Sequence, residues 1–110
     1  MPSYGTASFH AQQGAEKALK ALLARHGVPV ERTHDLGRLL RQAENVSPGI
    51  ATRLADADAL TPFAVLTRYP MSTPPTERAQ ATEHLALARP VFEVVTECLR
   101  DYLAGAASAT

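Results

Sequence analysis

The sequence predicts an all-α protein, and three observations support this class. Alanine occurs 20 times and leucine 13 times in 110 residues, whereas valine and isoleucine together occur 8 times, a balance that favours helix over sheet. Apolar residues recur at steps of three and four along most of the chain. Glycine and proline lie at the ends of these periodic stretches, where helices of ordinary length would end.

Length and charge restrict the organisation and the partners. A chain of 110 residues is predicted to be one domain, with residues 1–6 and 105–110 frayed. The 11 basic side chains balance the 11 acidic ones, so no global charge attracts nucleic acid or an anionic membrane. Any such partner must be bound by a local patch.

Location is predicted to be cytoplasmic, without a membrane segment. The lone Cys98 can form no internal disulfide and no multi-cysteine zinc site, which fits a reducing compartment. No apolar run approaches the roughly 18 residues of a transmembrane helix, and the first residues do not resemble a signal peptide.

The first helix is predicted from about Ala7 to His26. Its stripe consists of alanine and leucine, with lysine and glutamine on the opposite face. Gly27 tolerates the left-handed backbone that often ends a helix, and Pro29 prevents the helix from resuming. This is the sharpest boundary that the sequence predicts.

Two further helices are predicted in the middle of the chain. One runs from about Thr33, its expected N-cap, to Glu44, and buries the stripe Leu36, Leu39, Leu40 and Ala43. The other begins at Ser47-Pro48 and continues with Ile50, Leu54, Ala57 and Leu60 until Thr61-Pro62 interrupts it. A short helical piece is expected at 63–67.

The last helix is predicted to follow a proline-rich loop at 70–75, with Thr76 as its N-cap. Its expected seam alternates four- and three-residue steps through Ala81, Leu85, Ala88, Phe92, Val95, Leu99 and Leu103. Pro90 lies inside this seam and is expected to kink the helix.

No metal or cofactor site is predicted. The four histidines, His10, His26, His34 and His84, have no helical partner that would make a ligand pair. Cys98 reads as a small core residue rather than a nucleophile. The glycines stand singly, so there is no phosphate-binding loop.

Three segments in order carry a family resemblance: residues 13–23 (QGAEKALKALL), residues 33–36 (THDL) with Leu39-Leu40 behind them, and residues 67–70 (TRYP) before an alanine-rich last helix. Together they resemble the HEPN family, the small helical domains named for nucleotide binding in higher eukaryotes and prokaryotes. The match is greatest with its Arg-Tyr-Pro subgroup. It extends from about Tyr4 to Leu103.

The resemblance implies an antiparallel, up-and-down bundle of four to five helices that forms a homodimer. It also implies a minimal nucleotidyltransferase as the partner in a toxin–antitoxin-like module. Members usually begin with another amphipathic helix, which this sequence lacks before Tyr4. Without that helix, an apolar groove would be exposed. Either the native start lies upstream, or a dimer mate or partner protein covers this groove.

A nucleotide or RNA phosphate site is predicted on the matched segments. Lys17 and Lys20 share the polar face of the first helix, and His34 adjoins the free N–H groups at the start of the second. Arg68 can bind phosphate through its planar fork, and Tyr69 can stack on a base. Structural roles stay open: Glu16 can pair with Lys20, His34 can order the helix start, and Arg68 can pair with Asp58.

The alternative is an enzyme. Many HEPN members are ribonucleases with an arginine followed, after four to six residues, by a histidine, and Arg78 and His84 fit this spacing. A metal-independent endoribonuclease would use Arg78 to stabilise the scissile phosphate and His84 as general acid or base. A third interpretation is a structural adaptor whose helices bind another helical protein.

Overall fold

The described part of the chain folds into five helices. The structure, a computed structural model, describes residues 4–64 and 78–108, with side chains for 7–64 and 78–100. The elements are α1 (Tyr4–Arg25), α2 (Leu36–Glu44), α3 (Ile50–Arg53), the 3-10 helix η1 (Ala55–Ala64) and α4 (Arg78–Ser108). The all-α class is confirmed, and no strand occurs in the described residues. The expected cap Thr76 and most of the piece at 63–67 lie outside them.

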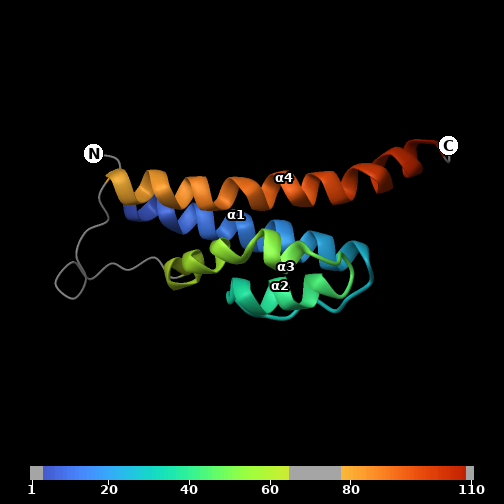
Figure 1. The fold of residues 1–110 in the computed structure, drawn as a ribbon, viewed down its shortest axis with the longest axis horizontal. Helices are drawn as coiled ribbons and strands as arrows, with labels where there is room; N and C mark the ends of the chain where they lie inside the picture. The colour runs from blue at the N-terminus through green and yellow to red at the C-terminus, as the bar shows by residue number, and fades with distance from the viewer. Residues whose placement is uncertain (1–3, 65–77, 109–110) are drawn as a thin grey trace.

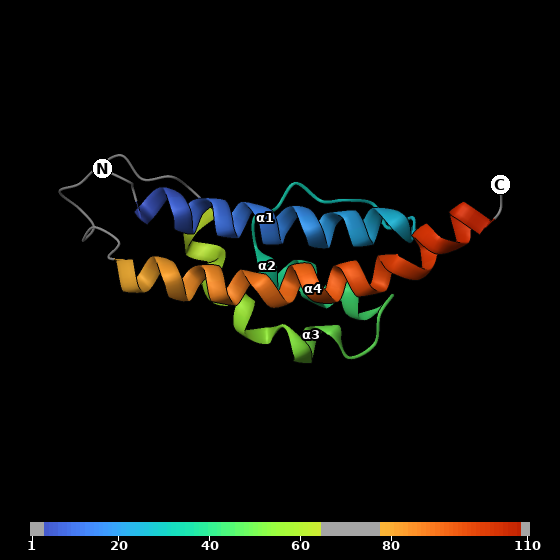
Figure 2. The ribbon, with the colours of Figure 1, turned by 90° about the horizontal axis from the view of Figure 1, so that it is seen from above.

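The two long helices, α1 and α4, lie side by side and run in the same direction (Figures 1 and 2). Ser8 near the start of α1 contacts His84 near the start of α4. Further along both helices, Gly14 lies against Phe92. The alternating directions of an up-and-down bundle therefore hold for α2, the α3–η1 segment and α4, whereas α1 is parallel to α4.

The connection between α1 and α2 explains this parallel pairing. The expected boundary is confirmed: Gly27 has φ +73°, and the N–H of Val28 donates to the carbonyl of Leu23 at 3.0 Å. The next residues return along the bundle, so that His34 hydrogen-bonds to Glu16, well before the end of α1. α2 then starts beside the middle of α1 and runs the same way.

The start of α2 differs from the expectation in its N-cap residue. Asp35 takes this role, with its Oδ1 accepting from the N–H of Arg38 at 3.1 Å. The hydroxyl of Thr33 instead accepts from the N–H of Asp35 at 3.1 Å, a local turn before the helix. The predicted buried stripe of α2 is confirmed.

The expected third helix is divided into two shorter elements. Gly49, at φ +93°, precedes α3, and the Glu44 carboxylate accepts from the N–H groups of Gly49 and Ala51 at 2.8 and 3.0 Å. After four residues α3 gives way to η1, which contains Pro62. Aspartate is a poor helix former, and the Asp58 side chain of η1 is bound to the start of α2.

The last helix buries a face next to the expected seam. Ala81, Ala88 and Val95 are buried as predicted, whereas Leu85 and Phe92 are exposed. Val91 and Val94 are buried in their place. The contact face follows positions 81, 84, 88, 91 and 95, which begin with a three-residue step where the expected seam begins with a four-residue step. α4 continues through Pro90 and on to Ser108.

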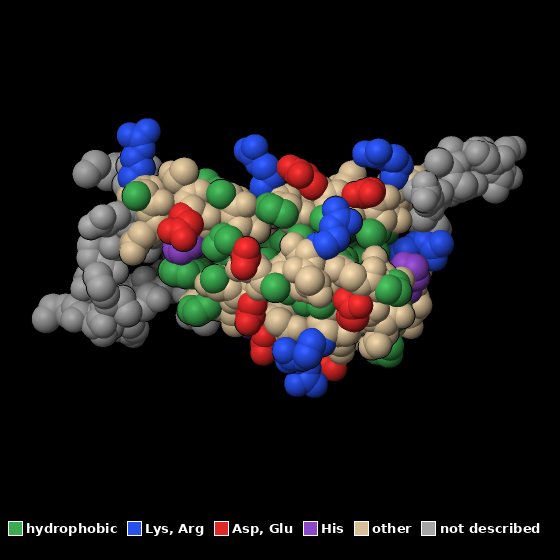
Figure 3. Space-filling model, viewed as in Figure 1, with side chains coloured by type: hydrophobic (Ala, Val, Ile, Leu, Met, Phe, Trp, Pro, Cys, Tyr) green, Lys and Arg blue, Asp and Glu red, His purple; other side chains and the backbone are tan. Residues whose placement is uncertain are grey.

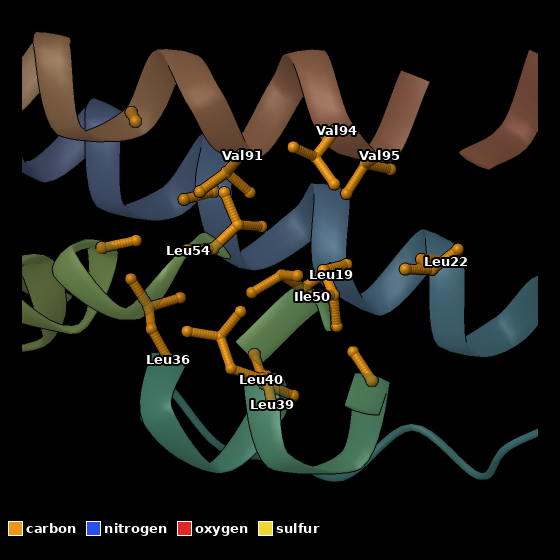
Figure 4. Close-up of a cluster of buried hydrophobic side chains, with 14 of the residues drawn as sticks. Leu19, Leu22, Leu36, Leu39, Leu40, Ile50, Leu54, Val91, Val94 and Val95 are labelled. Carbon is orange, nitrogen blue, oxygen red and sulfur yellow. The ribbon is translucent and has the colours of Figure 1, made fainter. Parts of the chain in front are cut away.

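The core lies where α1, α2, α3 and α4 meet (Figure 4). Side chains from the four helices, and from Leu54 directly after α3, point toward one another and are almost fully buried: Leu19, Leu22, Leu36, Leu39, Leu40, Ile50, Leu54, Val91, Val94 and Val95. Each such side chain contributes roughly 1.5–3 kcal/mol through burial, so this cluster supplies the main force that holds the helices together.

The surface carries charges of both signs, interspersed over the face shown in Figure 3. No single-sign patch covers this face, in keeping with the balanced composition. None of the described helices combines the length and apolar character that a bilayer crossing requires.

Candidate functional site

A stripe of polar side chains runs along α1. Ser8, Gln12 and Glu16 recur every four residues, so they share one face, and all three are buried. Lys20 continues the stripe at its half-exposed end. Buried polar groups need hydrogen-bond partners. Two histidines from distant segments provide contacts, His84 at Ser8 and His34 at Glu16.

The Glu16 carboxylate is the centre of the larger cluster. Its Oε1 accepts from His34 Nδ1 at 2.7 Å and from Gln12 Nε2 at 3.2 Å. Its Oε2 accepts from Lys20 Nζ at 3.0 Å. Gln12 Nε2 also donates to the carbonyl of His34 at 3.1 Å. These bonds fix both the ring and the backbone of His34 against α1.

Burial and hydrogen bonding act in opposite directions on the pKa of Glu16. Burial disfavours the charged carboxylate and raises this pKa. The bonds from His34, Lys20 and Gln12, together with the charge of Lys20, outweigh burial and leave the pKa of Glu16 below its ordinary value. Glu16 is therefore an ionised, buried carboxylate in the neutral pH range.

The start of α2 does not offer the free N–H groups that the sequence led us to expect. The Leu36 N–H donates to Thr61 Oγ1 at 3.0 Å, and the Gly37 N–H donates to Asp58 Oδ1 at 3.0 Å. The Arg38 N–H donates to Asp35. Two carboxylates thus occupy the positive end of this helix, and an anion near His34 must be bound by side chains instead.

The other histidine, His84, is held at the opposite end of the stripe. Its Nδ1 lies 2.7 Å from Ser8 Oγ. Its ring is half-buried, with its centroid 4.2 Å from that of Phe63 in η1. Contacts from two elements therefore fix the orientation of this imidazole.

Arg78 lies at the start of α4 and is exposed, and its carbonyl accepts from Thr82 Oγ1 at 2.9 Å. Six helical positions separate it from His84, which corresponds to about 600° of rotation and roughly 9 Å along the axis. The two side chains therefore leave the helix in directions about 120° apart. Within one chain, they do not converge on one phosphate.

The remaining predicted site residues are placed as follows. Lys17 is exposed on α1, next to Glu16 in sequence but about 100° around the helix from it. Arg68 and Tyr69 lie outside the described residues. The structure thus brings Lys20 and His34 together on Glu16, with Lys17 on the adjoining surface.

A second polar region lies on the outer side of α2. It is a shallow, open depression of about 370 Å³ lined by Glu31, Arg38, Arg41, Gln42 and Asn45. Glu31 already accepts from Arg38 Nε at 2.6 Å and from Gln42 Nε2 at 2.8 Å. These bonds tie the returning connection to α2, and they occupy much of the polar lining.

In residues 4–64 and 78–108, no three histidine, cysteine, aspartate or glutamate side chains are grouped to hold a metal ion. Cys98 is half-buried, with its Sγ 3.6 Å from Ser47 Oγ.

Sequence reasoning missed the buried part of the site. Ser8 and Gln12 were not singled out, and Glu16 was considered only as the partner of Lys20. The signal was the four-residue spacing of polar side chains from Ser8 through Lys20, each of which directly follows an alanine or a leucine. A polar stripe beside an apolar one indicates that another segment supplies the hydrogen-bond partners.

Comparison with known protein families gives a match over almost the full sequence. A family model described as HEPN domain matches residues 2–99, nearly the whole chain. Neither a curated protein nor a solved structure matches.

Proposed function

The chain belongs to the HEPN domain family, and on this basis we propose that it is the nucleotide- or RNA-phosphate-binding half of a two-component module. Its partner would be a minimal nucleotidyltransferase, in a toxin–antitoxin-like pair, and the chain would act as a homodimer. Family membership supports a nucleotide- or RNA-related function in general. The partner, the homodimer and the binding residues belong to the proposal.

The observation that supports this function best is the meeting of Lys20 and His34 on Glu16. Lys20 Nζ has three donors, of which Glu16 uses one, so others remain for a phosphate. His34 is 60% exposed through its side chain, and Lys17 adds a cation on the adjoining surface. The proposal also includes Arg68 as a phosphate ligand and Tyr69 as a base-stacking group.

The test is equilibrium binding of a short fluorescein-labelled single-stranded RNA, and separately of ATP, over a series of salt concentrations. Replacement of Lys17 and Lys20 by alanine should weaken binding. It should also reduce the slope of log affinity against log salt concentration, by up to the equivalent of about two phosphate contacts. The matched control is the Arg89→Ala/Arg100→Ala double variant, which removes two exposed cations from α4. Equal effects in both variants would indicate non-specific attraction rather than a site.

Wild-type protein that binds neither RNA nor ATP would instead support the structural adaptor. Sedimentation velocity of the chain alone, and of the chain co-expressed with a minimal nucleotidyltransferase, then tests the homodimer and the partner directly. A chain that stays monomeric and does not co-sediment would count against the two-component module.

A second candidate function, a metal-independent endoribonuclease, is favoured by the hydrogen bond between His84 and Ser8. This bond and the contact with Phe63 hold the imidazole in one orientation, as general acid–base chemistry requires. Because Arg78 and His84 diverge on one helix, a dimer mate would have to bring the arginine to the phosphate.

An RNA cleavage assay in EDTA tests the enzyme. Wild-type protein, His84→Ala, Arg78→Ala and the Lys17/Lys20 double alanine variant are compared on mixed RNA substrates. Loss of cleavage in His84→Ala and in Arg78→Ala would establish the ribonuclease. Absence of cleavage by every protein, with RNA binding intact, leaves the binding function alone.

A further inference from the structure

The contact between Glu16 and His34 gives the imidazole a defined direction. Glu16 is buried, whereas the His34 side chain is 60% exposed, so the ring lies across the boundary between the protein and solvent. Its Nδ1 lies 2.7 Å from the carboxylate, and the carbonyl of His34 is held by Gln12. Among the described residues, no hydrogen bond to Nε2 is found. Because the two ring nitrogens point in different directions, Nε2 is directed away from the Glu16 carboxylate.

This direction determines what the ring can offer a ligand. An ionised carboxylate can only accept, so Nδ1 must carry a proton. A neutral ring then has a lone pair on Nε2, which repels a phosphate oxygen. Only the doubly protonated ring presents an Nε2–H donor and a positive charge to the outside.

We infer that Glu16 is a positioning residue for His34, and that a phosphate group binds at Nε2 of His34 only when the ring is protonated. This inference rests on the proposed phosphate-binding function and deepens it. Phosphate binding at this site takes up a proton, and affinity falls as pH rises. Glu16 contributes by fixing Nδ1 as a donor, without touching the phosphate.

The charges of the neighbouring elements fit this role. On α1, Glu16 is shared by His34 and Lys20, so the three groups together have no net charge when the ring is neutral and one positive charge when it is protonated. Asp35 follows His34 in the chain, and Asp58 of η1 binds the N–H of Gly37. With these carboxylates near the start of α2, the charge on His34 decides whether the region attracts an anion.

The experiment is binding of the labelled RNA and of ATP between about pH 5 and pH 8, the range in which histidine changes charge. For the wild-type protein, affinity should fall with rising pH, by up to about tenfold per pH unit, the limit for one proton. His34→Gln should lose this pH dependence. Glu16→Gln should reduce this pH dependence, because an amide can donate as well as accept, so Nδ1 is no longer fixed as a donor and a neutral ring can present Nε2–H.

The control variant is His26→Gln, an exposed histidine at the end of α1, which should keep the wild-type pH profile. Circular dichroism shows whether Glu16→Gln still folds, and His34→Gln, at an exposed position, tests the same coupling independently of the buried carboxylate. Imidazole nitrogen NMR gives a separate readout: neutral wild-type His34 should carry its proton on Nδ1.

The outcomes separate this inference from the function on which it rests. No binding of RNA or ATP at any pH would overturn the proposed function and the inference together. Binding that does not change with pH, or a neutral His34 protonated on Nε2, would overturn the inference and leave phosphate binding in place.

Discussion

The ring of Phe92 in α4 lies directly over Gly14 in α1. A Cβ added at Gly14 would fall 2.6 Å from Phe92 Cζ, closer than carbon atoms can approach. Glycine inside a helix is otherwise unfavourable by about 1 kcal/mol relative to alanine. Gly14 is therefore explained by the space that Phe92 needs rather than by the helix itself.

The first prediction is a coupling between these two residues. Gly14→Ala alone should gain none of the roughly 1 kcal/mol expected from helix propensity, because the ring must move. In the Phe92→Ala background, the same substitution should stabilise by up to that amount. Urea denaturation of the four proteins of the cycle measures the coupling, with Ala21→Gly on the exposed side of α1 as the reference for propensity. Additive effects would contradict the prediction.

The second prediction concerns Asp58, which links η1 to the start of α2. Its Oδ1 accepts from the Gly37 N–H at 3.0 Å and from Thr61 Oγ1 at 2.9 Å. Asp58→Ala should lower the free energy of unfolding by about 1 kcal/mol, as for the loss of a helix cap. The neighbouring exposed aspartate in Asp56→Ala is the control and should change stability little. Thermal denaturation of both variants measures the two stability changes, and equal changes would contradict the prediction.

The third prediction is a pH dependence of stability due to Glu16. Its pKa is lower in the folded protein than its ordinary value of 4.5, so the ionised form favours folding. This contribution is fully present above about pH 4.5 and declines as pH falls through the folded pKa. Glu16→Gln should reduce the acid-induced loss of stability, measured by urea denaturation at stepwise lower pH. Glu93→Gln, on the exposed side of α4, is the comparison.

The fourth prediction concerns Glu44 at the end of α2. Hydrogen bonds from the N–H groups of Gly49 and Ala51 lower the pKa of this carboxyl. Glu44→Ala should destabilise the turn into α3, and Glu44→Gln should do so less, because its amide keeps one acceptor oxygen. Amide hydrogen exchange at Gly49 and Ala51 should become faster in the order wild type, glutamine, alanine. Unchanged exchange in the alanine variant would argue against this cap.

Local sequence signals predicted the helices well where one segment decides the outcome. The end of α1 at Gly27 and Pro29 needs only a left-handed residue and a missing N–H, and both are visible in the sequence. The buried stripe of α2 follows in the same way from its leucine spacing. All-α architecture needs no more than the sum of such signals.

Features that depend on two distant segments were not predictable. The parallel pairing of α1 and α4 depends on the return of the chain to His34, and spacing alone does not reveal that direction. The buried face of α4 differs from the predicted one because Leu85 and Phe92 suit a core as well as Val91 does, so the sequence alone does not distinguish them. Their exposure depends on what α1 presents opposite them.

The candidate site follows the same division. Lys20 could be selected from the polar face of the first helix and His34 from its place before the second, but their common partner Glu16 became apparent only from the fold. The free N–H groups expected at α2 are occupied by Asp58 and Thr61, which lie more than 20 residues further along the chain. Tertiary partners of this kind leave no local pattern.

The side-by-side packing of α1 and α4 also affects how the chain is made. The contact between Ser8 and His84 spans 76 positions, so α1 leaves the ribosome long before the helix that covers it. At about 5–20 residues per second, this interval is on the order of 4–15 seconds. During that time the leucine- and alanine-rich face of α1 is covered by only some of the elements that bury it in the folded protein. The nascent chain is then most exposed to aggregation or chaperone capture.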